Sequence, residues 1–212
     1  MIENLFVNGC SFNTTNKHAG INTYVGKMVA DHYGYELHNF ARGGRGNKRI
    51  EITTKMFFEK NPQRKIDTLA LIEWTTSVRN DYVSYTWKRM PGFSSSWKSY
   101  ATSDVLRKMP GLKVDENESI STINHINNLQ NYFDLHRIPY IMYFGMNNKI
   151  SKSGDTKLLK NFTNFFRMGY SHYQYCQDND LYVSSDDYHP SARGHKLWTQ
   201  DLIKYIDDIR RT

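Results

Sequence analysis

Near its start the chain reads Leu5-Phe6-Val7-Asn8-Gly9-Cys10-Ser11-Phe12, a short apolar run followed by a glycine, a cysteine and a serine. The apolar run is too short for a helix of its own and predicts a buried strand. Glycine permits a tight turn after that strand, and such a turn can present a serine hydroxyl with its backbone N–H free. A serine that caps the next helix or turn explains the same residues. The stretch therefore predicts a strand–turn unit and makes Ser11 a candidate nucleophile.

The same strand signal recurs along the chain, and helix-like stretches separate the apolar runs. Further runs at 36–40, 68–74 and 140–144 lie near turn residues and predict strands. Apolar residues at helical spacing predict helices at 23–33, 48–59, 119–135 and 197–209. Strands that alternate with helices imply a parallel sheet covered on both faces. The expected fold class is therefore α/β, with functional residues in the loops that follow the strands.

Two regions do not fit this alternation. Residues 82–118 are aromatic and basic, and because they lack a strong strand pattern we interpret them as an insertion or lid rather than a second domain. Residues 151–180 combine an expected helix at about 158–166 with a tyrosine-rich loop. A length of 212 residues favours one domain with a core large enough to be stable without disulfide bonds or other cross-links. We therefore expect a single domain over 1–212 that carries the insertion.

Composition limits the compartment and the chemistry. An apolar fraction of 39% and a charged fraction of 23% are typical of a soluble globular protein. No apolar run approaches the roughly 20 residues of a membrane helix, and residues 1–12 lack the layout of a secretory signal. The two cysteines, Cys10 and Cys176, indicate reduced thiols without zinc spacing. We expect a cytoplasmic protein, or a virion-associated one if a phage encodes it, that uses no metal and no cofactor.

The charge balance is basic. A formal net charge of +7 and a pI near 9.3 favour contact with anions such as nucleic acid or acidic polysaccharide. The basic residues are dispersed along the chain, and no nucleic-acid recognition motif accompanies them. A solvated surface explains the excess, so nucleic acid is not the expected partner, and the sequence leaves the oligomeric state open.

A second candidate segment, Asp186-Asp187-Tyr188-His189-Pro190-Ser191, precedes the last expected helix. A carboxylate three residues before a histidine can reach the imidazole N–H, fix its tautomer and stabilise the imidazolium. Pro190 suits a first helical turn and would fix where His189 points. Helix capping explains the Asp, Ser and Pro residues but not the histidine between them. We therefore take Asp186 and His189 as candidate partners of Ser11.

A third segment, Asn39-Phe40-Ala41-Arg42-Gly43-Gly44-Arg45-Gly46-Asn47, places three glycines between a strand and a helix. Its spacing matches neither the dinucleotide-binding nor the P-loop pattern, so nucleotide binding is a weak interpretation. The alternative is a loop whose backbone N–H groups face the Ser11 turn.

Together the three segments resemble the SGNH (GDSL-like) hydrolase superfamily. Gly9-Cys10-Ser11-Phe12 is similar to its first block, usually Gly-Asp-Ser-Leu, and residues 39–47 are similar to its second block. Asp186-x-x-His189-Pro190-Ser191-x-x-Gly194 is similar to its last block, the most specific of the three. The order along the chain agrees as well, and the surrounding sequence resembles SGNH-like proteins of tailed bacteriophages and some bacteria.

The resemblance implies a flavodoxin-like, three-layer α/β/α sandwich and ester hydrolysis. Ser11 would attack the carbonyl, with His189 as general base and Asp186 orienting it. The backbone N–H groups of Ser11 and Gly44 would hold the oxyanion. The third block of the family supplies an asparagine as a further oxyanion donor. That asparagine is missing at the end of the third expected strand, where Thr75 is the expected substitute.

The substrate is predicted more coarsely. Arg42 and Arg45 flank the presumed oxyanion loop and could hold an anionic group, although solvated loop charges explain them equally well. The many tyrosines and tryptophans suit sugar faces, so our hypothesis is a short-chain ester such as an O-acetyl group on carbohydrate. Two other functions stay open. One is a weakly active or inactive SGNH-fold module that binds carbohydrate or builds a virion, and the last is nucleic-acid binding.

Overall fold

The computed structural model describes residues 1–77, 79–87, 93–101, 117–147 and 161–211. A parallel four-stranded sheet forms its centre, in the order β2-β1-β3-β6. The strands span Asn4–Asn8 (β1), Glu36–Asn39 (β2), Thr68–Trp74 (β3) and Tyr140–Phe144 (β6). Each pairs in parallel with its neighbours, so the predicted parallel sheet is confirmed.

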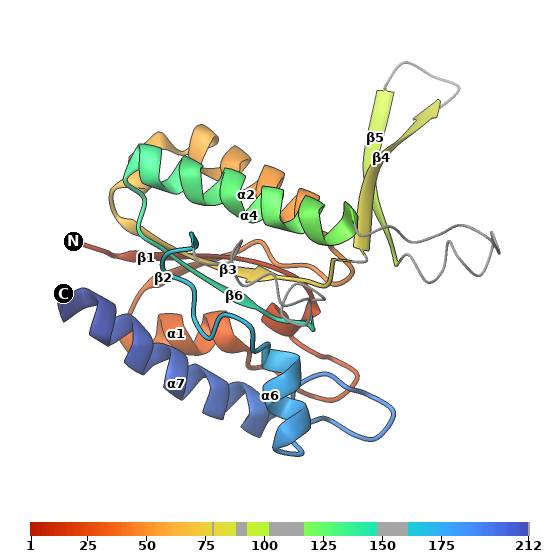
Figure 1. Ribbon diagram of the computed structural model, residues 1–212, viewed down its shortest axis with the longest axis vertical. Coiled ribbons are helices and arrows are strands. Elements are labelled where there is room, and N and C mark those ends of the chain that lie inside the picture. Colours follow the sequence, from red (N-terminus) through yellow and green to blue (C-terminus); the bar gives the residue numbers. More distant parts are fainter. Residues whose placement is uncertain (78, 88–92, 102–116, 148–160, 212) are drawn as a thin grey trace.

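Helices cover both faces of the sheet (Figure 1). On one face lie α2 (Asn47–Lys60) and α4 (Asn117–His136), and on the other lie α1 (Val25–Tyr33) and α7 (Ala192–Arg211). A short helix, α6 (His172–Asp178), precedes α7. None of the helices that the structure describes is long and apolar enough to span a membrane. The predicted α/β/α sandwich is therefore confirmed.

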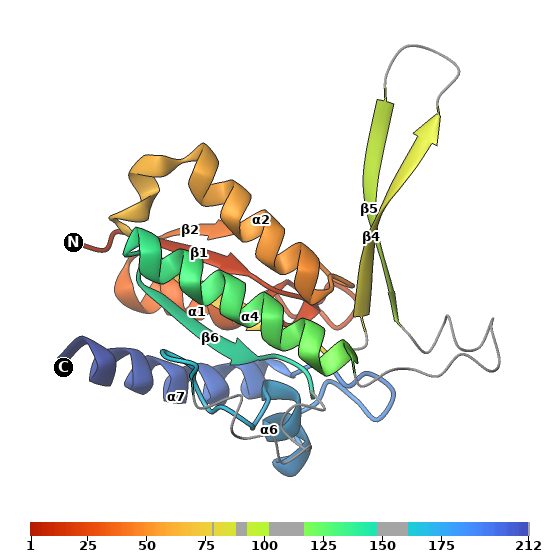
Figure 2. The same cartoon turned by 45° about the horizontal axis from the view of Figure 1, so that its top comes forward.

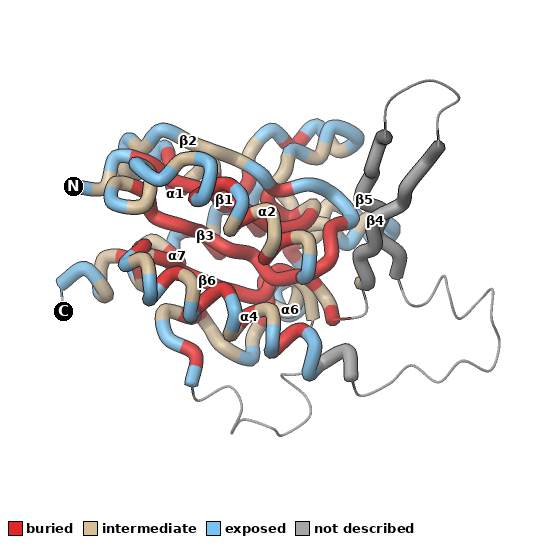
Figure 3. Tube along the Cα trace, turned by 90° about the horizontal axis from the view of Figure 1, so that it is seen from above, coloured by how far each residue is buried: buried red, intermediate tan, exposed pale blue. Residues whose placement is uncertain are grey.

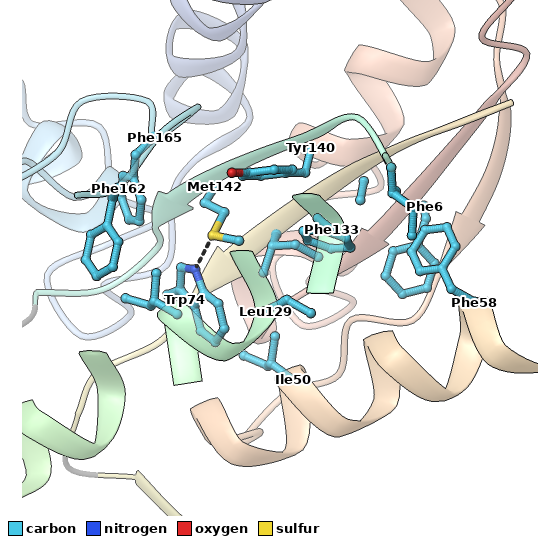
Figure 4. Close-up of a cluster of buried hydrophobic side chains, with 14 of the residues drawn as sticks. Phe6, Ile50, Phe58, Trp74, Leu129, Phe133, Tyr140, Met142, Phe162 and Phe165 are labelled. Carbon is cyan, nitrogen blue, oxygen red and sulfur yellow. Dashed lines mark hydrogen bonds between the residues drawn. The ribbon is translucent and has the colours of Figure 1, made fainter. Parts of the chain in front are cut away.

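Three of the four strands, β1, β3 and β6, are largely apolar because both of their faces are buried, whereas the edge strand β2 is exposed or half-buried. Successive side chains of a strand point to opposite faces, so Phe6 packs under α2 and α4 while Leu5 and Val7 pack under α1 and α7. In the layer under α2 and α4, the Trp74 indole donates to the Met142 thioether at 3.3 Å (Figure 4). Figure 3 shows the buried trace concentrated in the strands at the centre of the molecule. This packing fixes the carboxyl ends of the strands, where the candidate site residues follow.

A two-stranded antiparallel hairpin lies within the region that we interpreted as lacking strands. β4 (Arg79–Trp87) pairs with β5 (Phe93–Ala101) and joins no other strand among the described residues. The hairpin follows the carboxyl end of β3 and projects away from the sandwich (Figure 2). Because a strand outside the main sheet need not alternate toward the core, its sequence lacks the expected signal. Residues 88–92 and 102–116 of the interpreted insertion lie outside the described part, and its role as a lid stays a prediction.

The prediction of a helix at about 158–166 is wrong for residues 161–166, which the structure describes. Residues 161–166 form a turn and an irregular segment, in which Phe165 forms an isolated parallel bridge with Met142 of β6. Phe162 and Phe165 are buried against the core, which explains the apolar character that indicated a helix. Residues 158–160 lie outside the described part.

Candidate active site

β1 brings Ser11 to the carboxyl edge of the sheet. The strand ends at Asn8, and one turn of 3-10 helix, η1 (Ser11–Asn13), begins three residues later. A Cβ atom on Gly9 would lie 2.6 Å from the Cβ atom of Glu73 on β3, which is closer than folded chains tolerate. Glycine is therefore required for the turn to approach β3, and the predicted strand–turn unit is present.

A buried carboxylate holds the turn on both sides of Ser11. Glu73 Oε1 accepts the backbone N–H of Cys10 at 3.2 Å and its thiol at 2.7 Å, and Oε2 accepts the side-chain amide of Asn13 at 2.5 Å. Burial raises the pKa of Glu73, and burial together with Glu73 raises the pKa of Cys10 to about 12. Cys10 is therefore an unreactive thiol. Glu73 was not among the predicted site residues. Its only signal in the sequence is that an acidic residue lies inside an apolar strand.

His189 lies between Ser11 and a carboxylate. Its Nε2 atom is 3.0 Å from Ser11 Oγ, and its Nδ1 atom is 2.5 Å from Asp187 Oδ1. Asp187 also accepts the backbone N–H of His189 at 3.0 Å, and its Oδ2 accepts the side-chain amide of Asn16 at 3.0 Å. The hydrogen bonds from His189 are the main reason that the pKa of Asp187 is lowered. The ionised carboxylate and the imidazole are thus held in one orientation beside the serine.

The structure places Asp187, and not the predicted Asp186, at the imidazole. The Asp186 side chain is exposed, and its backbone N–H donates to Ser184 Oγ at 3.3 Å. An aspartate readily accepts the backbone N–H two residues further on, and this local turn directs Asp187 toward the ring of His189. A bond from Val183 N–H to the His189 carbonyl at 3.0 Å fixes the loop. The carboxylate partner is therefore corrected from Asp186 to Asp187.

The glycine-rich loop faces the Ser11 turn, as the alternative to nucleotide binding predicts. The Arg42 N–H donates to the Gly9 carbonyl at 3.2 Å. A Cβ atom on Gly43 would lie 3.9 Å from Ser11 Cβ, in ordinary van der Waals contact. Gly44 has a φ of 77°, a conformation that glycine adopts with little strain. Gly43 is thus the glycine of this loop that faces the serine side chain, and Gly44 makes the turn beside it.

The other predicted residues lie elsewhere than expected. Thr75 is buried; its N–H donates to Asn47 Oδ1 at 2.9 Å and its hydroxyl accepts from Arg79 at 3.2 Å. Arg45 is buried, and its guanidinium donates to Asn8 Oδ1 at 3.0 Å, a structural position rather than the predicted substrate-facing one. Arg42 is exposed and donates to the carbonyl of its neighbour Ala41 at 3.4 Å.

A cleft of about 560 Å³ opens at Ser11 and His189. Every residue that lines it has a polar or charged side chain, although the carbon atoms of these side chains supply much of the lining surface. The residues come from the η1 turn, the segment after it and the histidine loop: Ser11, Thr14, Thr15, Asn16, Lys17, His18, Asp187 and His189. Thr75 and Gly44 do not belong to this lining. Among the described residues there is no group of three or more His, Cys, Asp or Glu side chains that could hold a metal ion.

The chain is similar to solved structures of low sequence identity. The psychrotrophic esterase EstA from Pseudoalteromonas sp., determined in a form inhibited by monoethylphosphonate, shares 13% identity over 99% of this chain and 100% of its own, with a TM-score of 0.56. A protein of the lipolytic G-D-S-L family from Desulfitobacterium hafniense matches at 12% identity over 96% and 99% of the two chains, with a TM-score of 0.48. A Bacteroides fragilis acylhydrolase matches at 12% over 98% and 88%, with a TM-score of 0.45.

The likeness to the esterase extends over 99% of the chain and shows that the two proteins share the three-layer α/β/α fold. No protein-family model and no curated protein sequence matches the chain.

Proposed function

We propose that this chain is an SGNH-type serine esterase in which Ser11, His189 and Asp187 form the triad. The observation that carries the proposal is the chain of hydrogen bonds from Ser11 Oγ to His189 Nε2, 3.0 Å, and from His189 Nδ1 to Asp187 Oδ1, 2.5 Å. A serine within hydrogen-bond reach of a base that a third group orients is the general arrangement of an activated nucleophile. The shared fold with an esterase supports the same assignment.

Asp187 accepts a hydrogen bond from the Nδ1–H group of His189. The Nε2 atom therefore carries no proton and can accept the proton of Ser11. As Oγ attacks the ester carbonyl carbon, His189 takes this proton and Asp187 stabilises the imidazolium. The tetrahedral intermediate then expels the alcohol, to which His189 returns the proton. In the second half a water molecule gives a proton to His189 and attacks the acyl-enzyme, which releases the acid and restores Ser11.

The oxyanion would be held by backbone donors. We assign the Ser11 N–H and an N–H of the Gly43–Gly44 turn, because a Cβ atom on Gly43 would point at the serine side chain. The Thr75 hydroxyl accepts from Arg79 instead of lining the cleft, so it is not part of this assignment. One missing oxyanion donor typically lowers the rate about a hundredfold or more, so we expect slow turnover.

The lining of the cleft favours a small polar ester. Hydroxyl, amide and basic side chains surround Ser11, which suits a short acyl group on a hydrophilic alcohol better than a long acyl chain. Tyr188, which adjoins His189, is 54% exposed and packs edge-on against Tyr182. An exposed aromatic ring next to His189 in the chain can stack on a sugar face, which supports an O-acetyl group on carbohydrate as the substrate.

Hydrolysis of p-nitrophenyl acetate tests the proposal, with Ser11→Ala and His189→Ala as the inactive variants. Ser185→Ala is the matched control, because this exposed serine lies in the histidine loop. A phosphonate ester provides a second readout that does not depend on turnover. Ser11 Oγ would bond to phosphorus as the leaving group departs, and peptide mass spectrometry would locate the adduct. We expect both signals to vanish in the Ser11 and His189 variants and to persist in the control.

Absence of both turnover and phosphonate labelling in the unmodified chain would reject an esterase. It would favour a non-catalytic SGNH-fold module that binds carbohydrate or builds a virion. The observation that favours this alternative is the hydrogen bond that Arg79 donates to the hydroxyl of Thr75, the residue expected to replace the asparagine donor of the family.

A further inference from the structure

A second polar cavity lies beyond the carboxyl end of β3. It has a volume of about 240 Å³ and is formed by the first turn of α2, the segment between β3 and β4, and α4. Asn47 ties these three elements together, because its side chain bonds to the Thr75 backbone and donates to Thr122 Oγ1 at 3.1 Å. The cavity is therefore a fixed feature of the packing between elements that the core positions.

The charges around this cavity are positive. Lys48 and Arg79 line it. Within the described part of the chain, no acidic side chain lines the cavity and neither cation forms an ion pair. His125 also lines it, and its Nδ1 atom is 2.6 Å from Glu51 Oε2. Glu51 lies behind the lining and also pairs with Lys55 at 2.6 Å, so its charge is already matched.

The N-terminal end of α2 and a buried hydroxyl face the same space. α2, a helix of 14 residues, begins at Asn47 with no side-chain cap and no acidic residue in its first turn, so its positive end lies at the cavity. Ser77 lines the cavity, is 5% exposed, and its hydroxyl has no hydrogen-bond partner in the structure as described. A buried hydroxyl without a partner is costly unless a ligand or water completes it. An oxyanion would satisfy the helix end, the hydroxyl and the two cations together.

The cavity is connected to the nucleophile through Arg79. Its guanidinium donates to the Thr75 hydroxyl, at the strand end that the SGNH third block occupies. The positive charge of Arg79 also acts on Cys10, the residue before Ser11. Burial and Glu73 raise the pKa of the Cys10 thiol, and the charge of Arg79 lowers it. A substrate that spans both places would present its ester to Ser11 and its anionic group to Arg79.

We propose that this cavity binds an oxyanion group, a phosphate, sulfate or carboxylate, and that the ester cleaved at Ser11 carries that group. The second half rests on the proposed function, whereas the first half does not. The residues assigned to the anion are Lys48, Arg79 and Ser77, in place of Arg42 and Arg45, which the sequence suggested.

Calorimetric titration with inorganic phosphate, at constant ionic strength, tests the first half without any turnover. We expect binding to the unmodified chain and to Ser11→Ala, and about tenfold weaker binding to Arg79→Gln and Lys48→Gln, as loss of one charge-assisted contact implies. Lys60→Gln, the same charge change at the other end of α2, is the matched control and should bind normally. Lys48 is exposed, so its variant keeps the test valid if Arg79→Gln fails to fold. No binding, or equal binding by all variants, would overturn the site.

Paired esters test the second half. The first pair compares p-nitrophenyl hemisuccinate, which carries a carboxylate on the acyl side, with the neutral p-nitrophenyl butyrate. The second pair compares 4-acetoxybenzoate, which carries the carboxylate on the alcohol side, with the neutral 4-acetoxybenzamide. In at least one pair kcat/KM should favour the anion, and Arg79→Gln should remove about tenfold of that preference. Phosphate binding without such a preference would refute the substrate class. Turnover of no ester, with phosphate binding intact, would refute the proposed function and leave the anion site standing.

Discussion

Asp187→Asn is the change that most directly tests the corrected triad. The Asp187 carboxylate lies 2.5 Å from His189 Nδ1 and keeps the ring proton on that atom. An asparagine offers a side-chain N–H in place of one oxygen and favours the other tautomer, in which Nε2 carries the proton and cannot accept one from Ser11. The variant therefore removes both the orientation of the base and the charge that stabilises the imidazolium.

The expected loss follows from the geometry and the exposure of the pair. At an effective dielectric constant of about 20, unit charges at this separation attract by about 7 kcal/mol. The side chains of His189 and Asp187 are 40% and 32% exposed, so water weakens the attraction, and we take about half of it. A loss of about 3–4 kcal/mol from the transition state corresponds to about 200–1,000-fold in kcat.

The assay is p-nitrophenyl acetate hydrolysis, with the rate of phosphonate labelling of Ser11 as a second measure. Asp186→Asn is the matched control: it removes the same charge from the adjacent, exposed position and should keep kcat within about twofold of the unmodified value, as expected for a surface change. Circular dichroism would verify that both variants fold. If Asp186→Asn lost as much activity as Asp187→Asn, or more, the assignment of Asp187 would fall.

Three further changes probe the support of the site. Asn16→Ala removes one hydrogen bond to Asp187 Oδ2 and should lower kcat/KM about fivefold, with an unchanged value counting against that role. Glu73→Gln turns an amide N–H toward the Cys10 or Asn13 donors and should lower the free energy of unfolding by about 1–3 kcal/mol in urea titrations; a neutral result would contradict the network. Burial and the charge of His189 lower the pKa of His195 to about 4, below its value of about 6.5 in the unfolded chain, so the unfolded state binds more protons between these values. The free energy of unfolding should therefore fall by about 3 kcal/mol from pH 6.5 to pH 4, and His195→Gln should remove most of this pH dependence. An unchanged pH dependence in the variant would contradict the role of His195.

The elements that bury apolar side chains against the central sheet were predictable. Residues 68–74 form a strand because all seven side chains of β3 are buried, and this leaves a continuous apolar signal. The β4–β5 hairpin has no such signal because it stands away from the core. The segment around Phe162 and Phe165 has the signal but is not a helix, because these rings enter the core from an irregular stretch that borders β6.

The site residues that a sequence motif identifies by residue type were predictable. Those that depend on the local backbone conformation were not. Ser11 and His189 follow from their motifs and meet at 3.0 Å. Asp186 and Asp187 are chemically identical neighbours, so only the turn that bonds Asp187 to the His189 N–H distinguishes them. Asn16 reaches Asp187 from 171 residues away in the chain, a contact that no local pattern encodes.

The placement of the nucleophile depends on β3 as much as on β1. Ser11 lies between two residues, Cys10 and Asn13, that both donate to Glu73, so the turn cannot shift without breaking bonds inside a buried site. The same carboxylate is enclosed from the other side by Gly145 after β6, where an added Cβ would lie 2.6 Å from Glu73 Cδ. Three neighbouring strand ends therefore fix one side chain, which in turn fixes the serine. This arrangement explains why a charged residue persists in the most buried strand: its oxygens accept donors that no apolar residue could satisfy.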